Sequence, residues 1–338
     1  MRLVSVTLIL IAVLAGAMAQ PALANDSTAE LGAGGLVYVT TDDVAMTSED
    51  LFISMDEVRV RYQFENKSDK DVTTLVAFPM PDIKGDIDFM DSIPVDDPAN
   101  FLGFKTTVDG APVTAKLQQR VSALGVDQTA LIQSLGVPLA PQLEATRAAL
   151  DKLPREQWDR LINLGLAAVD TFDAGKGWES HLAPMWVLST AYYWEQTFPA
   201  KRTITVEHSY KPSVGSTAGV SFSTPESRKE PWFQDYVRKY CIEKSFLAAA
   251  DKAAAGRAEN DFLMEHRIEY ILRTGANWAG PISKFHLVVD KGSPKNLVSF
   301  CGDGVKKTGP TTFEMTKEDF YPEGDFDVLI LAGAGLEK

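Results

Sequence analysis

A group of aspartates in one connection between two predicted strands offers the most direct chemistry in this sequence. Hard cations such as Ca²⁺ are bound by several carboxylate and carbonyl oxygens, and Gly85 would allow the connection to turn around an ion. The group lacks the spacing of an EF-hand loop, so a solvated acidic loop is the alternative interpretation. No other cofactor is indicated. The candidate calcium ligands are Asp82, Asp86, Asp88 and Asp91.

Aromatic residues form a second candidate site. Alternation along a strand places Tyr192 and Trp194 on one face, where exposed rings could stack against a sugar or a peptide. The same rings could instead fill the core of a β-sheet, and we favour this interpretation because aromatic side chains supply much of the apolar area of such cores. The candidate ligand-binding residues are Trp186, Tyr192, Trp194 and Trp278.

No arrangement of residues typical of a known catalytic centre is present. Ser216 is out of register for a G-x-S-x-G nucleophile elbow, and the four histidines do not form an H-E-x-x-H motif. His208 lies on the apolar phase of its strand, which is typical of a core histidine. We therefore predict no catalytic residue. Two Asp or Glu carboxylates from separate loops, as in glycosidases, follow no spacing rule and stay open as an alternative.

The charge balance restricts the partners. The 338 residues include 33 Lys and Arg against 46 Asp and Glu, a net charge of −13. Nucleic acids and anionic membranes are bound by basic surfaces, so we exclude both as the main partner. Four histidines and two cysteines also provide few ligands for a zinc or iron–sulfur site.

The first 24 residues have the pattern of a secretory signal peptide. A basic start at Arg2 precedes the apolar residues 3–15, and Ala22-Leu23-Ala24 fits the A-x-A cleavage motif. Ala17-Met18-Ala19 is a second possible cleavage motif. The apolar run is too short to span a bilayer, and no later segment is long enough. We expect cleavage near Ala24, a periplasmic or secreted protein, and no transmembrane segment in the mature chain.

Export would place the two cysteines in an oxidising compartment. An even number of cysteines in that setting predicts a disulfide, here between Cys241 and Cys301. A nucleophilic thiol at Cys301 is the alternative.

The pattern of apolar residues predicts a mainly β or α+β fold. Val58, Val60, Tyr62 and Phe64 alternate with polar residues, which indicates a strand with one buried face. Short connections between such strands favour antiparallel, β-sandwich-like sheets. Residues of about 125–170 have helical spacing and form a predicted helical insertion. A boundary in the polar loop near residue 222 would divide the mature chain into a sandwich-like domain, 25–222, and an α+β domain, 223–338.

Several segments resemble one family of exported bacterial proteins, domain of unknown function family 4424. The resemblance covers essentially the whole mature chain and implies a protein of the cell envelope, without implying a reaction or catalytic residues. The segments that carry it are residues 25–36, Ser48-Glu49-Asp50-Leu51, Val58-Arg59-Val60-Arg61-Tyr62, residues 71–81, Phe198-Pro199-Ala200, His208-Ser209-Tyr210 and residues 277–282.

The leading functional hypothesis is a non-catalytic periplasmic binding or accessory protein whose partner is an envelope protein or a small ligand. An envelope hydrolase or carbohydrate-active enzyme that uses Asp or Glu carboxylates is the alternative. An assembly scaffold is the third possibility, and it would expose a large apolar patch.

Overall fold

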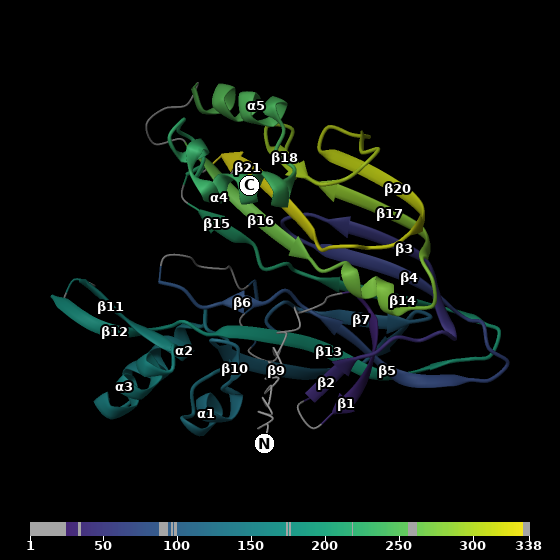
Figure 1. The fold of residues 1–338 in the computed structure, drawn as a ribbon, viewed down its shortest axis with the longest axis horizontal. Coiled ribbons are helices and arrows are strands. Elements are labelled where there is room, and N and C mark those ends of the chain that lie inside the picture. The colour runs from purple at the N-terminus through teal and green to yellow at the C-terminus, as the bar shows by residue number, and fades with distance from the viewer. Residues whose placement is uncertain are drawn as a thin grey trace, which may run out of the picture.

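The computed structural model describes residues 25–32, 35–87, 94–95, 97, 100–173, 175, 177–217, 219–255 and 262–333. The predicted signal peptide, residues 1–24, lies outside this part of the chain. The described elements are mainly β-strands in several sheets, with a few short helices, which confirms the predicted fold class (Figure 1).

The largest sheet, sheet B, has eight strands. Its order is β19-β20-β17-β3-β4-β14-β7-β8, and all neighbours are antiparallel except β17 and β3. Its strands are β3 (Val44–Ile53), β4 (Val58–Asn66), β7 (Lys105–Val108), β8 (Ala111–Val113), β14 (Thr203–Tyr210), β17 (Ile282–Asp290), β19 (Lys306–Lys307) and β20 (Thr312–Phe320).

Alternating side chains give sheet B two different faces. In β4, Val58, Val60, Tyr62 and Phe64 are buried while Arg59 is exposed, as the sequence pattern predicted. The turn after β7 is formed by Asp109 and Gly110. Asp109 and Gly110 both have positive φ angles, 48° and 78°, which is the conformation that a tight β-hairpin requires.

Sheet A has seven strands, in the order β10-β9-β13-β5-β1-β2 with β6 beside β13. Its longest strand is β13, which carries the aromatic run of the sequence. The strands are β1 (Ser27–Gly32), β2 (Gly35–Tyr38), β5 (Val72–Pro79), β6 (Ile83–Lys84), β9 (Lys116–Ala123), β10 (Val126–Asp127) and β13 (Val187–Phe198).

Sheet C is smaller, with the order β15-β16-β21-β18. Two helices, α4 (Pro231–Tyr240) and α5 (Lys244–Ala255), contact its strands, and Phe222 and Phe233 pack with Leu329 and Leu331 in a core of their own. The strands are β15 (Gly215–Thr217), β16 (Leu263–Tyr270), β18 (Leu297–Phe300) and β21 (Phe326–Gly333). Two 3₁₀ turns, η1 (Ser227–Lys229) and η2 (Arg273–Asn277), lie before α4 and after β16.

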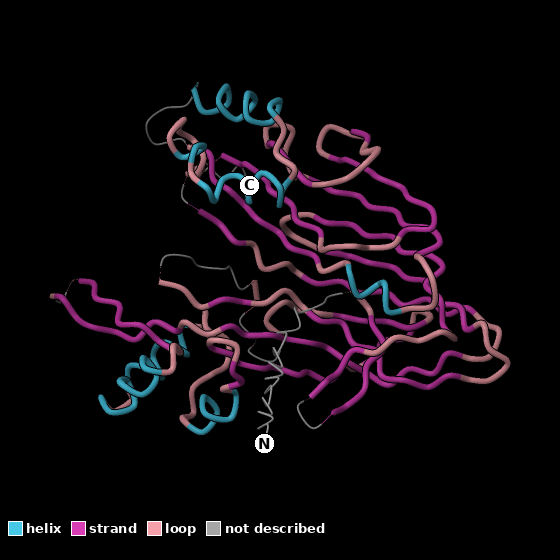
Figure 2. The backbone as a smooth tube through the Cα atoms, viewed as in Figure 1, coloured by secondary structure: helices cyan, strands magenta, loops and turns pink. Residues whose placement is uncertain are grey.

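Sheets A and C both pack against the inner face of sheet B. Phe78 of β5 lies 4.8 Å from His208 of β14, and Phe300 of β18 lies 6.4 Å from Phe313 of β20, between ring centroids. One hydrophobic core joins residues of all three sheets. The tube view shows the strands of these sheets as the bulk of the molecule (Figure 2). The arrangement is a β-sandwich in which two sheets share the opposite layer.

The two predicted units, residues 25–222 and 223–338, contribute strands to the same sheet. β17 and β20 lie directly beside β3 and β4 in sheet B, and Figure 1 shows these yellow-green strands next to the purple ones. The division into two domains stays a prediction.

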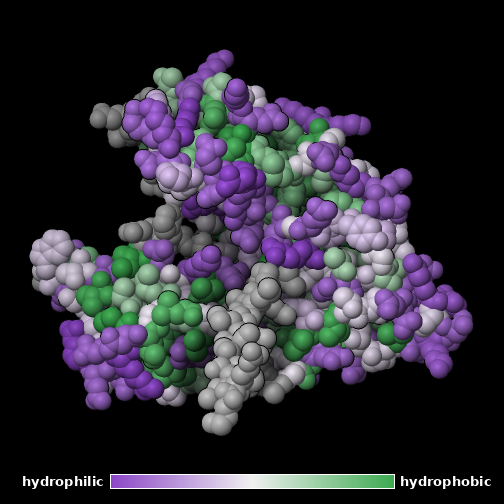
Figure 3. All heavy atoms as spheres, in the orientation of Figure 1, coloured by the Kyte–Doolittle hydropathy of each residue, from purple (hydrophilic) through white to green (hydrophobic). Residues whose placement is uncertain are grey.

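The predicted helical insertion is present. It consists of α1 (Thr129–Ser134), α2 (Glu144–Asp151) and α3 (Arg155–Asn163), followed by a separate hairpin of β11 (Ala167–Asp173) and β12 (Trp178–Pro184). Hydrophobic residues gather on this side of the molecule (Figure 3), and Trp178 of the hairpin is 77% exposed. No helix in the described part of the chain is long and apolar enough to cross a membrane.

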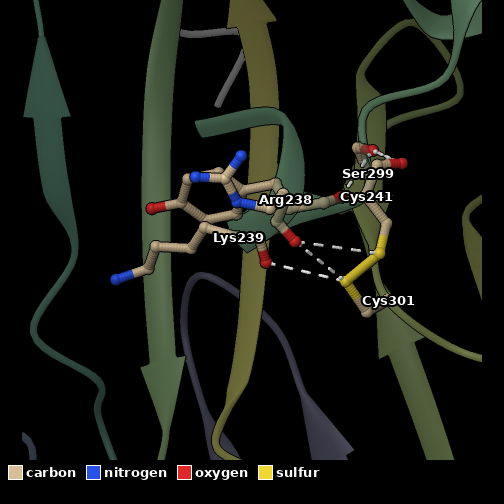
Figure 4. Close-up of a disulfide and its surroundings, with 6 residues drawn as sticks. Arg238, Lys239, Cys241, Ser299 and Cys301 are labelled. Carbon is tan, nitrogen blue, oxygen red and sulfur yellow. Dashed lines mark hydrogen bonds between the residues drawn. A yellow bond between two sulfur atoms is a disulfide. The ribbon is translucent and has the colours of Figure 1, made fainter. Parts of the chain in front are cut away.

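The predicted disulfide between Cys241 and Cys301 is formed. Cys241 ends helix α4 in a left-handed conformation, and Cys301 follows β18, so the bond joins the helix to sheet C (Figure 4). Ser299 strengthens the same junction, because its hydroxyl donates a hydrogen bond of 2.9 Å to the carbonyl of Tyr240.

Replacing Cys241 and Cys301 together with serine should lower the free energy of unfolding by about 2–4 kcal/mol, since the bond restricts the unfolded chain. Urea unfolding of the oxidised protein and of the double variant measures the difference. A reducing agent should destabilise the natural chain and leave the double variant unchanged. Equal unfolding midpoints for the two oxidised proteins would contradict the stabilising role.

Candidate functional site

The outer face of sheet B carries a shallow groove of about 480 Å³. Strands β7, β14, β4, β3 and β17 supply its lining, and the outward-facing side chains of these neighbouring strands form two rows across the sheet. Leu51, Val60 and His208 also border the groove, but their side chains are buried, so they contribute backbone atoms.

The first row is charged. Strand register places His286, Asp50, Arg61 and Glu207 side by side on β17, β3, β4 and β14. His286 Nδ1 lies 3.0 Å from Asp50 Oδ1, and Arg61 Nε lies 3.6 Å from Glu207 Oε1. Thr107 completes the row on β7 and donates a hydrogen bond of 3.4 Å to Glu207. Opposite charges on adjacent strands stabilise this arrangement.

The second row combines apolar and basic side chains. Val288, Phe52, Arg59, Ser209 and Lys105 follow one another across the same five strands. The Arg59 guanidinium lies 4.5 Å from the centroid of the Phe52 ring, a cation–π contact. Within the described residues, Lys105 has no carboxylate partner. This row therefore offers an apolar floor beside an unpaired ammonium group.

The side chains that line the groove include more basic than acidic groups, and Glu57, next to the lining, pairs with Arg59 at 3.3 Å. Arg59, Arg61 and Lys105 line it, against the carboxylates of Asp50 and Glu207. The sequence as a whole has 46 acidic residues against 33 basic ones. An excess of basic groups on an acidic protein favours anions at this position over the rest of the surface.

Among the described residues, the groove does not bring a nucleophile together with a base. His286 is the only histidine whose side chain lines it, and Ser209 lies three strands away. Neighbouring strands are about 4.8 Å apart, so the two side chains are separated by roughly 14 Å. A serine nucleophile must lie within hydrogen-bond reach of its base. The arrangement can bind a ligand, and it cannot activate Ser209 through His286.

Two of the four predicted calcium ligands, Asp82 and Asp86, lie in the described part of the chain. Asp82 accepts a hydrogen bond of 2.7 Å from the Ser189 hydroxyl, and burial raises the pKa of its carboxyl. Asp86 is half-buried, whereas Asp88 and Asp91 lie outside the described residues. No three metal-binding side chains come together elsewhere in the part of the chain that the structure describes. The calcium site stays a prediction.

The four aromatic candidates lie in the core, and none of them lines the groove. Trp186, Tyr192, Trp194 and Trp278 are at most 4% exposed. Tyr192 stacks on Phe104 at 4.3 Å between ring centroids. The indole of Trp186, directly before β13, donates a hydrogen bond of 2.8 Å to the carbonyl of Leu139 in the helical insertion. These contacts are those of packing residues, the interpretation that the sequence favoured.

Glu269 and Asp327 form a carboxylate pair that lies outside the groove. Glu269 and Asp327 are cross-strand neighbours on β16 and β21, and Lys239 lies 3.5 Å and 3.1 Å from their oxygens. Burial raises the pKa of Asp327 to about 6, although Lys239 opposes the shift. Neither carboxylate lines the groove.

The groove residues were not among the sequence candidates. Their polar phase was visible in the alternation of β4 and β14, where Arg59, Arg61, Glu207 and Ser209 occupy the positions between apolar residues. That alternation shows which face each residue occupies. It does not show that β14, β4, β3 and β17 are neighbours.

The sequence profile of one family, Domain of unknown function (DUF4424), matches residues 24–329. The chain belongs to this family. No curated protein matches the DUF4424 chain. Among solved structures, it is similar to one from Legionella pneumophila described as "a putative nutrient binding protein". The identity is 15% and the TM-score 0.45, and the match covers 92% of the DUF4424 chain and 71% of the other chain.

Replacing Trp186 with alanine should lower the free energy of unfolding by about 3–5 kcal/mol, because it removes a fully buried indole. Thermal or urea unfolding measures this loss. Trp178→Ala is the matched control, since the Trp178 side chain is exposed and its removal should change stability by no more than about 0.5 kcal/mol. Similar small effects for both variants would show that Trp186 is not a packing residue.

Proposed function

We propose that this DUF4424 protein is an exported, non-catalytic binding protein of the bacterial cell envelope, and that the groove on sheet B binds an organic anion with an apolar body. The groove, with its basic side chains beside an apolar floor, is the observation that carries the proposal. The signal pattern of residues 1–24 supports export.

Lys105 and the two arginines would select the anionic group. Lys105 is exposed and makes no ion pair among the described residues, so a carboxylate does not have to displace an existing partner there. Arg59 lies in the same row as Lys105, and Arg61 lies in the neighbouring row. Guanidinium groups bind carboxylates through two parallel hydrogen bonds in one plane. The Ser209 hydroxyl, opposite Arg59 on β14, adds a neutral donor.

Phe52 and Val288 would hold the apolar part of the ligand. They are paired across β3 and β17, and both are partly exposed at the base of the groove. The cation–π contact holds Arg59 over the Phe52 ring, which orients its guanidinium next to the apolar floor. A ligand that spans both features would place its apolar body over β3 and β17 and its anion toward β4, β14 and β7.

Hydrolysis is the second candidate, and one observation favours it. Asp50 and Glu207 lie on strands two positions apart, a separation of roughly 9–10 Å, close to the upper end of the separation of carboxylates in inverting glycosidases, about 6.5–9.5 Å. Arg61 lies between them on β4 and contacts Glu207 at 3.6 Å, so a basic side chain occupies the space between the two carboxylates. We therefore place binding first.

The test uses 4-phenylbutyrate as the probe, because it joins a ring to one carboxylate. At ten times its Kd, a ligand stabilises the folded protein by about 1.4 kcal/mol, so Tm should rise by about 2–4 °C. Lys105→Glu should abolish the rise, since it reverses the charge at the proposed anion position. A thermal shift series over probe concentration measures both.

Two controls make the test specific. The neutral amide of the same probe should give a much smaller shift, and Lys252→Glu, on the exposed surface of α5, should leave the shift unchanged. An equal response to the acid and the amide, or an unchanged response in Lys105→Glu, would contradict the proposed anion site. Release of product from aryl glycosides, lost in Glu207→Gln, would instead support the hydrolase.

A further inference from the structure

Asn25, the first residue after the predicted cleavage motif, lies in the interior of the protein. It is fully buried, and its backbone N–H donates a hydrogen bond to the hydroxyl of Thr274 in η2. Its side-chain amide donates to Glu49 Oε2 at 3.0 Å. Gly275 makes room for it, because a Cβ at that position would lie only 2.7 Å from Asn25 Nδ2. The first residues of the predicted mature chain are therefore held in a built site.

Two buried carboxylates surround this position. Asp26 Oδ1 lies 3.0 Å from His208 Nε2, with both side chains fully buried. Glu49 accepts hydrogen bonds only from neutral groups in the described chain, the amide of Asn25 and the hydroxyl of Tyr270 at 3.3 Å. Asp26 thus has a partner that can carry a positive charge, whereas Glu49 has none.

The same cluster has more acceptors than donors. Asn25 Oδ1 and Asp26 Oδ2 are buried without a hydrogen-bond partner among the described residues. Tyr270 and Tyr62 share one hydrogen bond of 2.9 Å between their hydroxyls, and Trp278 donates to the carbonyl of Asp26. Buried polar atoms normally have partners, so this cluster lacks a donor group.

We propose that the α-ammonium group of Asn25, formed by cleavage after Ala24, is the missing cation and donor of this buried cluster. Hydrolysis of the Ala24–Asn25 peptide bond by a signal peptidase adds one water, leaving a carboxylate on Ala24 and an ammonium on Asn25. The single N–H of the amide becomes three N–H groups. One continues to bind Thr274, and two become available to oxygens of Glu49 and Asp26.

The proposal rests on the predicted cleavage after Ala24 and is independent of the groove. Its consequence is that Glu49 has a positively charged partner in the core only in the cleaved chain. The uncleaved chain must bury Glu49 beside Asp26 without a matching cation, which favours a neutral Glu49. Breaking a buried ion pair by removing one partner is strongly destabilising.

The pH dependence of stability follows from the groups around Glu49. These are Asn25 and Asp26 from the N-terminal segment, Tyr62 of β4, His208 of β14, Tyr270 of β16 and Asp50 on its own strand. In the uncleaved chain, burial raises the pKa of Glu49 from 4.5 to about 8. Because the folded chain then binds the proton more tightly than the unfolded chain, its stability falls as pH rises from 4.5 through about 8.

In the cleaved chain, the ammonium would hold Glu49 ionised. The stability of the folded protein would then no longer fall as the pH rises from 4.5 to about 8. The α-amino group of an unfolded chain has a pKa of about 8, and an internal ion pair would raise that of the folded chain. The contribution of the ammonium group to stability is therefore fully present below its unfolded pKa of about 8. It is lost as the pH rises through the higher pKa of the folded chain. The stabilities of the two forms should therefore diverge increasingly as the pH rises from 4.5 to about 8.

The experiment compares a chain that begins at Asn25 with one that retains Leu23 and Ala24. At pH 7.5 the chain that begins at Asn25 should have a Tm higher by about 5 °C or more, and the difference should narrow at pH 5.5. Glu49→Gln in both forms should remove at least half of the difference at pH 7.5. Glu30→Gln, an exposed acid on β1, is the matched control and should leave it unchanged.

Two outcomes would overturn the proposal. One is a Tm difference that is absent, or that is equal with glutamate and glutamine at position 49. The other comes from mass spectrometry of the exported protein: its first residue should be Asn25, and a chain that begins at Gln20 would place the ammonium outside the cluster. A first residue other than Asn25 in the mass spectrum would contradict the proposal even if a Glu49 variant fails to fold.

Discussion

The parallel pairing of β3 with β17 is the contact on which the rest of the structure depends. It pairs residues that are 236 positions apart, such as Asp50 and His286, and through β17 it attaches β20 and β19 to sheet B. His286 and Val288 reach the groove only because of this pairing, which places them beside Asp50 and Phe52. On the inner face it sets Phe285 beside Glu49, within the core that sheets A and C cover.

Two consecutive acids on β3 show how strongly the face of a strand determines the chemistry of a side chain. Glu49 points inward, is fully buried, and has a pKa raised to about 8 by that burial. Asp50 points outward, is 58% exposed in its side chain, and its Oδ1 lies 3.0 Å from His286 Nδ1. Successive side chains of a strand lie on opposite faces, so one position separates a core carboxylate from a surface one.

The molecule uses aromatic and charged residues for different tasks. Rings such as those of Phe78, Phe104 and Tyr192 pack between the sheets, around the His208–Asp26 pair. The open face of sheet B carries ion pairs and one cation–π contact instead. Because the rings are needed to join three sheets, the surface available for a ligand is defined by basic side chains over the small apolar floor of Phe52 and Val288.

The sequence by itself determined the local features of this protein. The alternation around Val58 and Tyr62, the helical insertion and the Cys241–Cys301 disulfide all depend on nearby residues or on a choice between very few partners. Only the tertiary structure decided which strands are neighbours. The groove and the cluster around Asn25 unite residues up to about 250 positions apart, such as Asn25 and Thr274. Periodicity reports the face of each strand and carries no information on its neighbour, so neither site could be predicted from it.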